Sequence, residues 1–362
     1  MRGSYRLGNG QARSETMPML PFLLLAVTAT APHPGKIETF GKWEVACDNL
    51  RRCEMTALHP DTGPGKAVDE DAPAEQADCS IVREPGPTGG FTVDVSASQQ
   101  RGRNAHIVID GTTFGGGVTE RDDLTLRGDA ARRIVAAMAT GEHMTLLGGG
   151  NAKPSHVSLD GSAAALRFID AEQGRAGTVT AVMAKGERLA STVPPAAVLP
   201  HITAVRAGGV AAPVTPALIR TIRALSKNEA CDISINEPIT GVAIGGGATL
   251  VLLPCEAGAY NVITIPFVVV AGKPALAIFD WPAENDNSDS GDSVPGLSNA
   301  GWDPETATLF SQTKGRGFGD CGDSESYVWD GRSFRLVDQE RMDICANQVN
   351  WLTVWRAVVD RR

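Results

Sequence analysis

A glycine-rich segment, KGRGFGDCG at residues 314–322, combines the residue types of an anion-binding loop. Its four glycines allow the backbone to turn N–H groups toward a ligand, and Lys314 and Arg316 add positive charge. The segment has neither the spacing of a nucleotide phosphate-binding loop nor that of a dinucleotide fingerprint. The alternative is a structural loop whose cations pair with nearby aspartates, and most glycine-rich connections are of this structural kind.

Aromatic and amide side chains elsewhere extend this candidate surface. Tyr260 and Asn261 follow a cysteine and a turn in PCEAGAYN, where they could line a pocket or tie a corner of the fold. Trp329 belongs to a set of six tryptophans that could form either an aromatic groove or a core. The candidate ligand-binding residues are Lys314, Arg316, Gly317, Asp320, Tyr260, Asn261 and Trp329.

No other motif indicates catalysis or metal binding. The serine and lysine of SQTK (residues 311–314) follow a strand-like stretch, whereas a penicillin-binding nucleophile needs a helix start. The acidic segment 284–293 fails the EF-hand pattern, because Leu297 occupies the position of the bidentate glutamate. The histidines have no metal-ligand spacing. We therefore expect no catalytic residue, no metal and no cofactor.

Seven cysteines predict a disulfide framework with one thiol left over. No Cys-x-x-Cys occurs, so neither thioredoxin-like redox chemistry nor a zinc knuckle has its motif. Pairing between sequence neighbours predicts the bonds Cys47–Cys53, Cys231–Cys255 and Cys321–Cys345, which leaves Cys79 unpaired. Such bonds persist in oxidising compartments and stabilise by roughly 2–4 kcal/mol each in the chain-entropy estimate.

The N-terminus has the pattern of an export signal. Basic residues precede the apolar stretch MLPFLLLAVTATA, which ends on small residues, so residues 1–31 are predicted to be a signal peptide. A membrane anchor and a disordered leader are the alternatives, although the apolar stretch is short for a bilayer span. We expect a periplasmic or secreted protein, with no transmembrane span in the mature chain.

Composition indicates many short strands. The 362 residues include 40 glycines and 22 prolines, which favour turns, and the hydrophobic fraction of 42% is ordinary for a globular protein. The net charge of −9 argues against nucleic acid as a partner. The predicted fold class is α+β, with two disulfide-stapled domains of short, mainly antiparallel strands and a few packed helices. The predicted domains are residues 38–187 and 215–362, joined by a Pro/Gly-rich linker at 188–214.

Local patterns predict the elements of both domains. Asp129, Ser162 and Thr215 are typical N-caps at the starts of three amphipathic helices. Asp330-Gly331 predicts a hairpin turn. The predicted helices cover residues 129–141, 162–174 and 215–227. The predicted strands cover residues 42–47, 53–58, 91–97, 106–110, 124–126, 143–147, 156–159, 177–183, 248–255, 261–270, 275–280, 306–312, 326–337 and 351–357.

Six segments together resemble a known family. FGKWEVACDNLRRCE, SLDGSAAALRFIDAEQGRAGT, PCEAGAYN, KGRGFGDCG, YVWDGRSFRL and WLTVWRA are similar to segments of the uncharacterised exported proteobacterial family called domain of unknown function 1176. That resemblance implies export and six characteristic cysteines, which match every cysteine here except Cys79. It transfers no catalytic residue. The opening Trp43–Cys47 segment is also similar to the invasion-associated locus B proteins of the bacterial envelope.

These observations favour a non-catalytic binding or structural protein of the bacterial cell envelope. Its partner is expected to be an unknown envelope component or protein. One alternative is an envelope-directed hydrolase, which requires a nucleophile or acid–base pair within a cleft. A second is a secreted effector or inhibitor that binds another protein through the acidic loop at residues 59–78.

Overall fold

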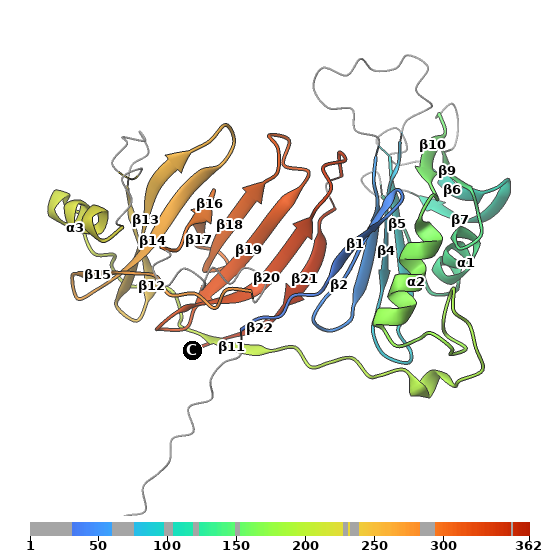
Figure 1. The fold of residues 1–362 in the computed structure, drawn as a ribbon, viewed down its shortest axis with the longest axis horizontal. Coiled ribbons are helices and arrows are strands. Elements are labelled where there is room, and N and C mark those ends of the chain that lie inside the picture. Colours follow the sequence, from blue (N-terminus) through green and yellow to red (C-terminus); the bar gives the residue numbers. More distant parts are fainter. Residues whose placement is uncertain are drawn as a thin grey trace, which may run out of the picture. The chain divides into compact units, whose positions relative to one another are not determined.

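The computed structural model describes most of the chain from residue 31 onward, and this part forms one compact unit. The described residues are 31–59, 76–97, 104–118, 123–148, 153–226, 231, 239–282, 294–348 and 350–362. The predicted signal segment as far as residue 30, most of the predicted acidic loop and the acidic segment 284–293 lie outside the described residues. Mostly antiparallel strands in several sheets, together with three α-helices, make up the described part (Figure 1), which confirms the α+β class.

Two antiparallel sheets and two helices form the N-terminal half. The six-stranded sheet has the order β1 (Ile37–Phe40), β2 (Trp43–Cys47), β3 (Cys53–Ala57), β4 (Asp78–Arg83), β5 (Phe91–Ser96) and β8 (Asp123–Arg127). The four-stranded sheet has the order β10 (Ser155–Ser158), β9 (His143–Gly148), β6 (Asn104–Ile109) and β7 (Thr112–Val118). On β5 the buried residues alternate with half-buried ones, as expected for a strand with one face on a core.

Helices α1 (Gly128–Met138) and α2 (Ser162–Glu172) cover one side of the six-stranded sheet (Figure 1). Helix α1 contacts β5 and β8, and α2 contacts β1 and β2. Their apolar stripes, which include Ile134 and Leu166, join Trp43, Ile81 and Val93 in one buried cluster. The hydrophobic effect of closing this cluster fixes the helices on the sheet.

Two further sheets form the C-terminal half and share a core. The first contains β12 (Gly241–Gly245), β13 (Ala248–Ala257), β14 (Val262–Val270) and β15 (Lys273–Leu276), with β16 (Leu297–Ser298) paired to β14. The second contains β17 (Gly301–Asp303), β18 (Thr308–Lys314), β19 (Gly322–Trp329), β20 (Phe334–Met342) and β21 (Leu352–Arg356). Leu250 packs into the core between the sheets, and Val251 packs on the other side against Ile222 of α3 (Pro216–Ser226). Strand β13 is thus buried on both faces, which explains its continuous apolar sequence.

Side chains from both halves interlock within the compact unit. Strand β21 contacts β2 and β3. The guanidinium of Arg356 donates to the buried carboxylate of Asp48, with Nε 2.7 Å from Oδ2. Glu44 accepts a hydrogen bond from the backbone N–H of Asp343 at 2.9 Å. The division into domains at 38–187 and 215–362 stays a prediction.

The predicted linker contains a strand. β11 (His201–Ala204) pairs in parallel with β22 (Val358–Arg361), and a 3₁₀ turn, η2, spans Ala190–Thr192. Part of the segment 188–214 is therefore tied to the C-terminal end by backbone hydrogen bonds rather than forming only a connection.

Three local predictions were wrong. Residues 177–183 form turns instead of a strand, because the N–H groups of residues 182–184 donate to the buried carboxylate of Asp170. Helix α1 begins at Gly128, which places Asp129 in its first turn rather than at the N-cap. Helix α2 has Gly161 as its N-cap, at φ 89°, and the hydroxyl of Ser162 donates to the carbonyl of Met138 instead.

Other local predictions were right. The hydroxyl of Thr215 accepts from the N–H of Leu218 at 3.2 Å, as a cap should. The hairpin between β19 and β20 turns at Asp330 and Gly331, although its connection is four residues long and closes with Asp330 N–H donating to the carbonyl of Ser333.

Candidate functional site

Three disulfides join the cysteine pairs expected from their sequence proximity. They are Cys47–Cys53, Cys231–Cys255 and Cys321–Cys345. Cys79 is free and fully buried on β4. Its burial raises the pKa of the thiol, and the negative charges of Asp94 and Asp78 act in the same direction. Cys79 is therefore an inert core residue rather than a reactive thiol.

The segment Lys314–Gly322, which we call the glycine loop, connects β18 to β19. Lys314 and Gly322 face each other as the last ladder pair, and the N–H of Gly315 donates to the carbonyl of Cys321 at 2.8 Å. A side chain at Gly315 would place its Cβ only 2.6 Å from the Cys321 sulfur. Glycine is required there because the disulfide lies against the backbone.

An ion pair closes the glycine loop from inside. Arg316 Nε donates to Asp320 Oδ1 at 2.8 Å, and Arg316 Nη2 donates to Asn347 Oδ1 at 3.2 Å. Asp320 also accepts from the N–H of Asn347 at 2.7 Å. The hydrogen bond from Arg316 lowers the pKa of the Asp320 carboxyl, so the pair stays ionised. The cation of Arg316 thus has a structural partner and is not available as a free anion ligand.

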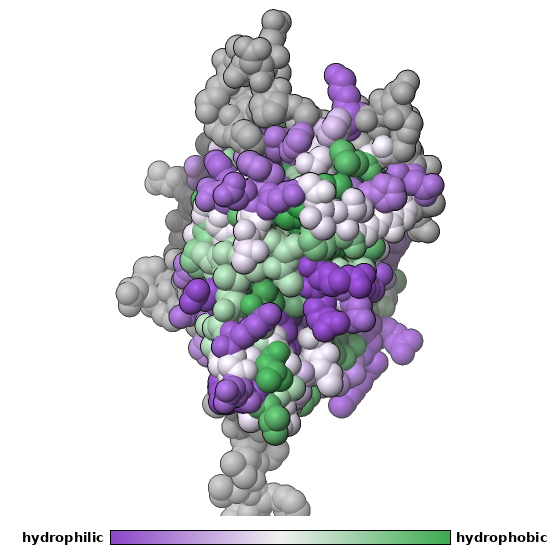
Figure 2. Space-filling model, turned by 90° about the vertical axis from the view of Figure 1, so that its right-hand side faces the viewer, coloured by the Kyte–Doolittle hydropathy of each residue, from purple (hydrophilic) through white to green (hydrophobic). Residues whose placement is uncertain are grey.

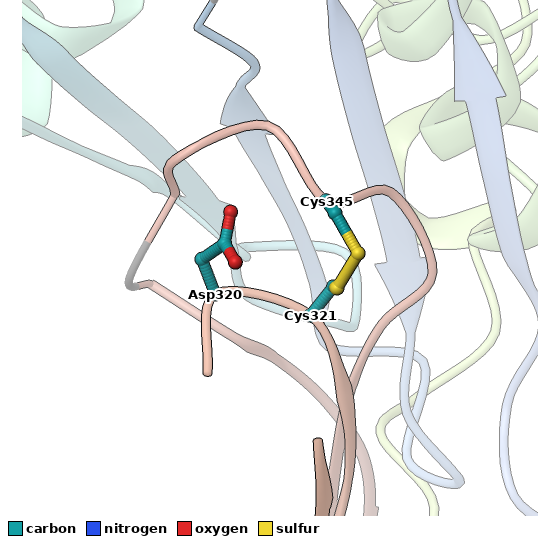
Figure 3. A group of neighbouring side chains, drawn as sticks. All are labelled: Asp320, Cys321 and Cys345. Atoms are coloured by element: carbon teal, nitrogen blue, oxygen red, sulfur yellow. A yellow bond between two sulfur atoms is a disulfide. The ribbon is translucent and has the colours of Figure 1, made fainter. Parts of the chain in front are cut away.

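Figure 3 shows Asp320 beside the Cys321–Cys345 disulfide. In the described part of the chain, these three residues are the one group of potential metal ligands that lie close together. Both sulfurs are bonded to each other, so neither is a thiolate that could bind a metal. The Asp320 oxygens accept from Arg316 and Asn347. The chemistry of this group is that of a structural anchor.

Tyr260 and Asn261 hold the other side of the glycine loop. The Tyr260 hydroxyl donates to the carbonyl of Gly315 at 3.0 Å. Asn261 makes a two-way contact with Lys314, donating to its carbonyl at 2.9 Å and accepting from its N–H at 3.1 Å. Asn299, which the sequence analysis missed, donates to Asn261 Oδ1 at 2.8 Å. Side chains outside the glycine loop thus hydrogen-bond to its backbone N–H and C=O groups. These bonds fix the conformation of the loop before any partner binds.

The outer surface of the glycine loop presents an aromatic side chain. Phe318 is 72% exposed and Tyr260 is 42% exposed. The Arg316 guanidinium carbon lies 5.8 Å from the centroid of the Phe318 ring. No carboxylate in the described residues forms an ion pair with Lys314. The sequence analysis missed Phe318, although an aromatic residue between glycines was its available signal.

Six of the seven candidate ligand-binding residues therefore lie in or beside the glycine loop. The exception is Trp329. Trp329 is buried at the opposite end of β19, paired with Phe334 across the hairpin. Its ring centroid lies 5.2 Å from that of Phe334, within the core shared by the two C-terminal sheets. The structure places Trp329 in core packing, away from the loop.

A histidine, a serine and an aspartate lie together where β4 pairs with β5. His59 Nε2 lies 2.7 Å from Asp78 Oδ1, and the hydroxyl of Ser96 donates to Asp78 Oδ2 at 3.5 Å. The serine and the histidine thus share one carboxylate, and in the described residues no hydrogen bond joins Ser96 to His59. A nucleophile needs its base as the direct partner, so these three residues lack the arrangement that the hydrolase alternative requires.

Comparison with known proteins relates the chain to proteins without an assigned activity. The family model described as "Protein of unknown function (DUF1176)" matches residues 37–358. The uncharacterized protein YpfG of Escherichia coli (strain K12) is 30% identical over 210 residues, which make up 55% of this chain and 59% of YpfG. The chain therefore spans about three fifths of that relative.

One solved structure is also similar. The invasion associated protein b from Bartonella henselae matches 38% of this chain and 99% of its own chain, at 18% identity and a TM-score of 0.29.

Proposed function

This chain belongs to the family DUF1176, and from that premise we propose that it is an exported, non-catalytic binding or structural protein of the bacterial cell envelope. Three closed disulfides support an oxidising compartment such as the periplasm. None of the helices in the described part of the chain has the length and apolar character needed to cross a membrane.

The observation that carries the proposal is the exposed ring of Phe318 on a loop that is fixed from three sides. The disulfide, the Arg316–Asp320 pair and the Tyr260–Gly315 hydrogen bond all restrain its backbone. A preorganised aromatic anchor loses little conformational entropy on binding, which is how interfaces gain affinity from few residues.

The partner that fits this surface is a protein with an apolar pocket for Phe318 and a carboxylate for Lys314. An aromatic ring exposed to 72% gains hydrophobic free energy when a pocket covers it. The ammonium of Lys314 lies on the same loop, and an acidic group on the partner would complement it. Arg316 is excluded from this role because its charge is paired within the loop.

Affinity capture from an envelope extract tests the proposal. The bait is the purified full chain, compared with Phe318→Ser and Lys314→Glu variants. Removing the ring from the centre of an interface is expected to lower affinity at least tenfold, since anchor residues contribute about 2 kcal/mol or more. A bound species identified with the wild-type bait and lost with both variants supports the proposal.

Leu189→Ser is the matched control, because Leu189 is 68% exposed and lies outside the glycine loop. The control bait should retain the species that the wild-type bait captures. Recovery of the same species with Phe318→Ser and Lys314→Glu would show that the glycine loop is not the contact surface.

A further inference from the structure

A cavity of about 630 Å³ lies on the N-terminal half, among the β4–β5 connection, the first turns of α1 and residues 175–185. Its charge is unlike that of the chain as a whole, which is −9. One acidic side chain, Asp129, lines it. The basic side chains that line it are Arg83, Arg132, Arg133, Arg175 and Lys185. Figure 2 shows the face of the molecule on the side of α1 and α2, where hydrophilic patches border a paler, partly hydrophobic band.

Arg83 is the buried cation in the wall of this basic cavity. Its residue is 4% exposed, and its guanidinium carbon lies 4.2 Å from the centroid of the Phe91 ring. Nη2 donates to the carbonyl of Thr180 at 2.7 Å, but Nε and Nη1 have no hydrogen-bond partner in the described residues. A buried donor without an acceptor costs about 1–3 kcal/mol, and more when it is charged. Both of these nitrogens are closed off from solvent, and Nη1 faces Asp170 Oδ1 at 3.7 Å. Arg83 therefore contributes positive charge to the wall of the cavity, and the exposed basic side chains at the rim supply the accessible donors.

Two buried arginines, Arg83 and Arg175, lie near one buried carboxylate, that of Asp170, so the positive charges outnumber the negative ones by one. Arg175 is fully buried and donates to protein oxygens, including the carbonyl of Gly86. Asp170 is the single carboxylate that forms an ion pair with Arg83 in the described residues, at 3.7 Å. Its oxygens also accept the N–H groups of residues 182–184. Burial lowers the pKa of Arg83 to about 9, the positive charge of Arg175 acts in the same direction, and the negative charge of Asp170 opposes them.

The N-terminus of α1 adds further donors. The helix is 11 residues long, its first residues Gly128 and Asp129 line the cavity, and its N-cap Arg127 makes no side-chain cap hydrogen bond. A helix start carries a partial positive charge and free N–H groups. The Asp129 carboxylate is paired with Arg132 at 2.8 Å, so its charge is offset.

We propose that the basic cavity binds the phosphate group of a phosphate-bearing ligand. A phosphate offers several acceptor oxygens that match the fork of an arginine and the N–H groups of a helix start. It also supplies the negative charge that the buried pair of arginines lacks. The cavity is larger than one phosphate needs, and its wall includes Phe91, Val179 and Val182, which leaves room for an organic body. This inference does not depend on the glycine loop.

Isothermal titration calorimetry on the full chain tests it with four phosphate-bearing probes and one dianion without phosphate, in chloride buffer. The phosphate-bearing probes are inorganic phosphate, glycerol 3-phosphate, vesicles of phosphatidylglycerol and vesicles of phosphatidylcholine. Binding of glycerol 3-phosphate identifies a free phosphate ester as the ligand type. Binding of phosphatidylglycerol vesicles alone identifies a lipid headgroup, and phosphatidylcholine is the control because choline masks the phosphate charge.

The test variant is Arg133→Gln/Lys185→Gln, because both side chains are exposed at the rim and their loss leaves the buried pair intact. We expect it to weaken binding of the responding probe at least tenfold, which corresponds to about 1.4 kcal/mol. Arg167→Gln is the matched control, an exposed arginine on α2 outside the cavity, and it should bind as the wild type does. Arg83→Gln, which removes the buried positive charge from the cavity wall, should also weaken binding at least tenfold, with circular dichroism used to confirm that this variant folds.

Three results would overturn the proposal. The first is no heat from any phosphate probe at millimolar concentration with folded wild-type protein. The second is equal affinity of the rim double variant and the Arg167→Gln control. Succinate serves as a dianion without phosphate, and its binding as tightly as glycerol 3-phosphate would refute the phosphate assignment.

Discussion

The buried carboxyl of Glu44, on the N-terminal sheet, contacts the C-terminal half, and its ionisation should make folding stability depend on pH. The side chain lies on β2 and is fully buried. One carboxylate oxygen accepts the Asp343 N–H at 2.9 Å, and the other has no hydrogen-bond partner in the described residues. Burial raises the pKa of Glu44 to about 7, and the negative charge of Asp343 adds to this effect. The Asp343 N–H, the Ile344 N–H and the charge of Arg341 oppose it.

The raised pKa makes folding stability depend on pH in a defined direction. The unfolded carboxyl ionises near 4.5, whereas the folded one stays protonated up to about 7. The free energy of unfolding is therefore highest below pH 4.5 and falls as the pH rises toward 7. At 1.36 kcal/mol per pH unit between these values, the loss at pH 8 is about 3 kcal/mol. Glutamine has the same shape and no charge, so Glu44→Gln should remove this loss.

Urea unfolding at pH 4.5 and pH 8, followed by tryptophan fluorescence, measures the effect. Glu44→Gln should be more stable than wild type by about 3 kcal/mol at pH 8 and within about 0.5 kcal/mol of it at pH 4.5. Glu38→Gln is the control, because it makes the same chemical change at an exposed position on β1. If Glu44→Gln and wild type differ in free energy of unfolding by the same amount at both pH values, ionisation of Glu44 is not the cause of the pH dependence.

Three further predictions concern stability and reactivity. Asp48→Asn should lower the free energy of unfolding by about 1.5–3 kcal/mol in urea at pH 7, because it removes the negative charge that accepts hydrogen bonds from the partly exposed Arg356 guanidinium. Thr215→Ala should lower it by about 1 kcal/mol in the same assay, since the cap on the Leu218 N–H is lost. Cys79 should react with an aromatic disulfide reagent only after denaturation, as the one free thiol, because burial keeps it protonated and inaccessible. Labelling of the native protein at the denatured rate would contradict the last prediction.

The sequence predicted features that depend on neighbours in the chain. Strands bounded by turn residues and disulfides between nearby cysteines were confirmed, because both are local. The N-cap errors at Asp129 and Ser162 arose because glycine backbone conformations at residues 128 and 161 start the helices instead. The strand predicted at 177–183 failed because the distant Asp170 captures its N–H groups, a contact that no local pattern could show.

The same distinction applies to the sites. Lys314, Arg316 and Asp320 were grouped correctly because they share one short loop. Trp329 was misplaced relative to them because β19 is eight residues long and separates it from the loop by roughly 20 Å. The basic cavity was missed entirely, since three segments supply its arginines and none has a motif of its own. Tertiary structure alone brings them together.

Site-specific photo-cross-linking in living cells tests whether the glycine loop is a binding surface. A benzophenone amino acid replaces Phe318 in the full-length chain, and a second strain carries it at Leu189, which is also exposed. We expect a discrete cross-linked protein adduct in the periplasmic fraction for position 318 and none for position 189. An exported, folded protein that forms no adduct at position 318 would contradict the assignment of the glycine loop as the binding surface.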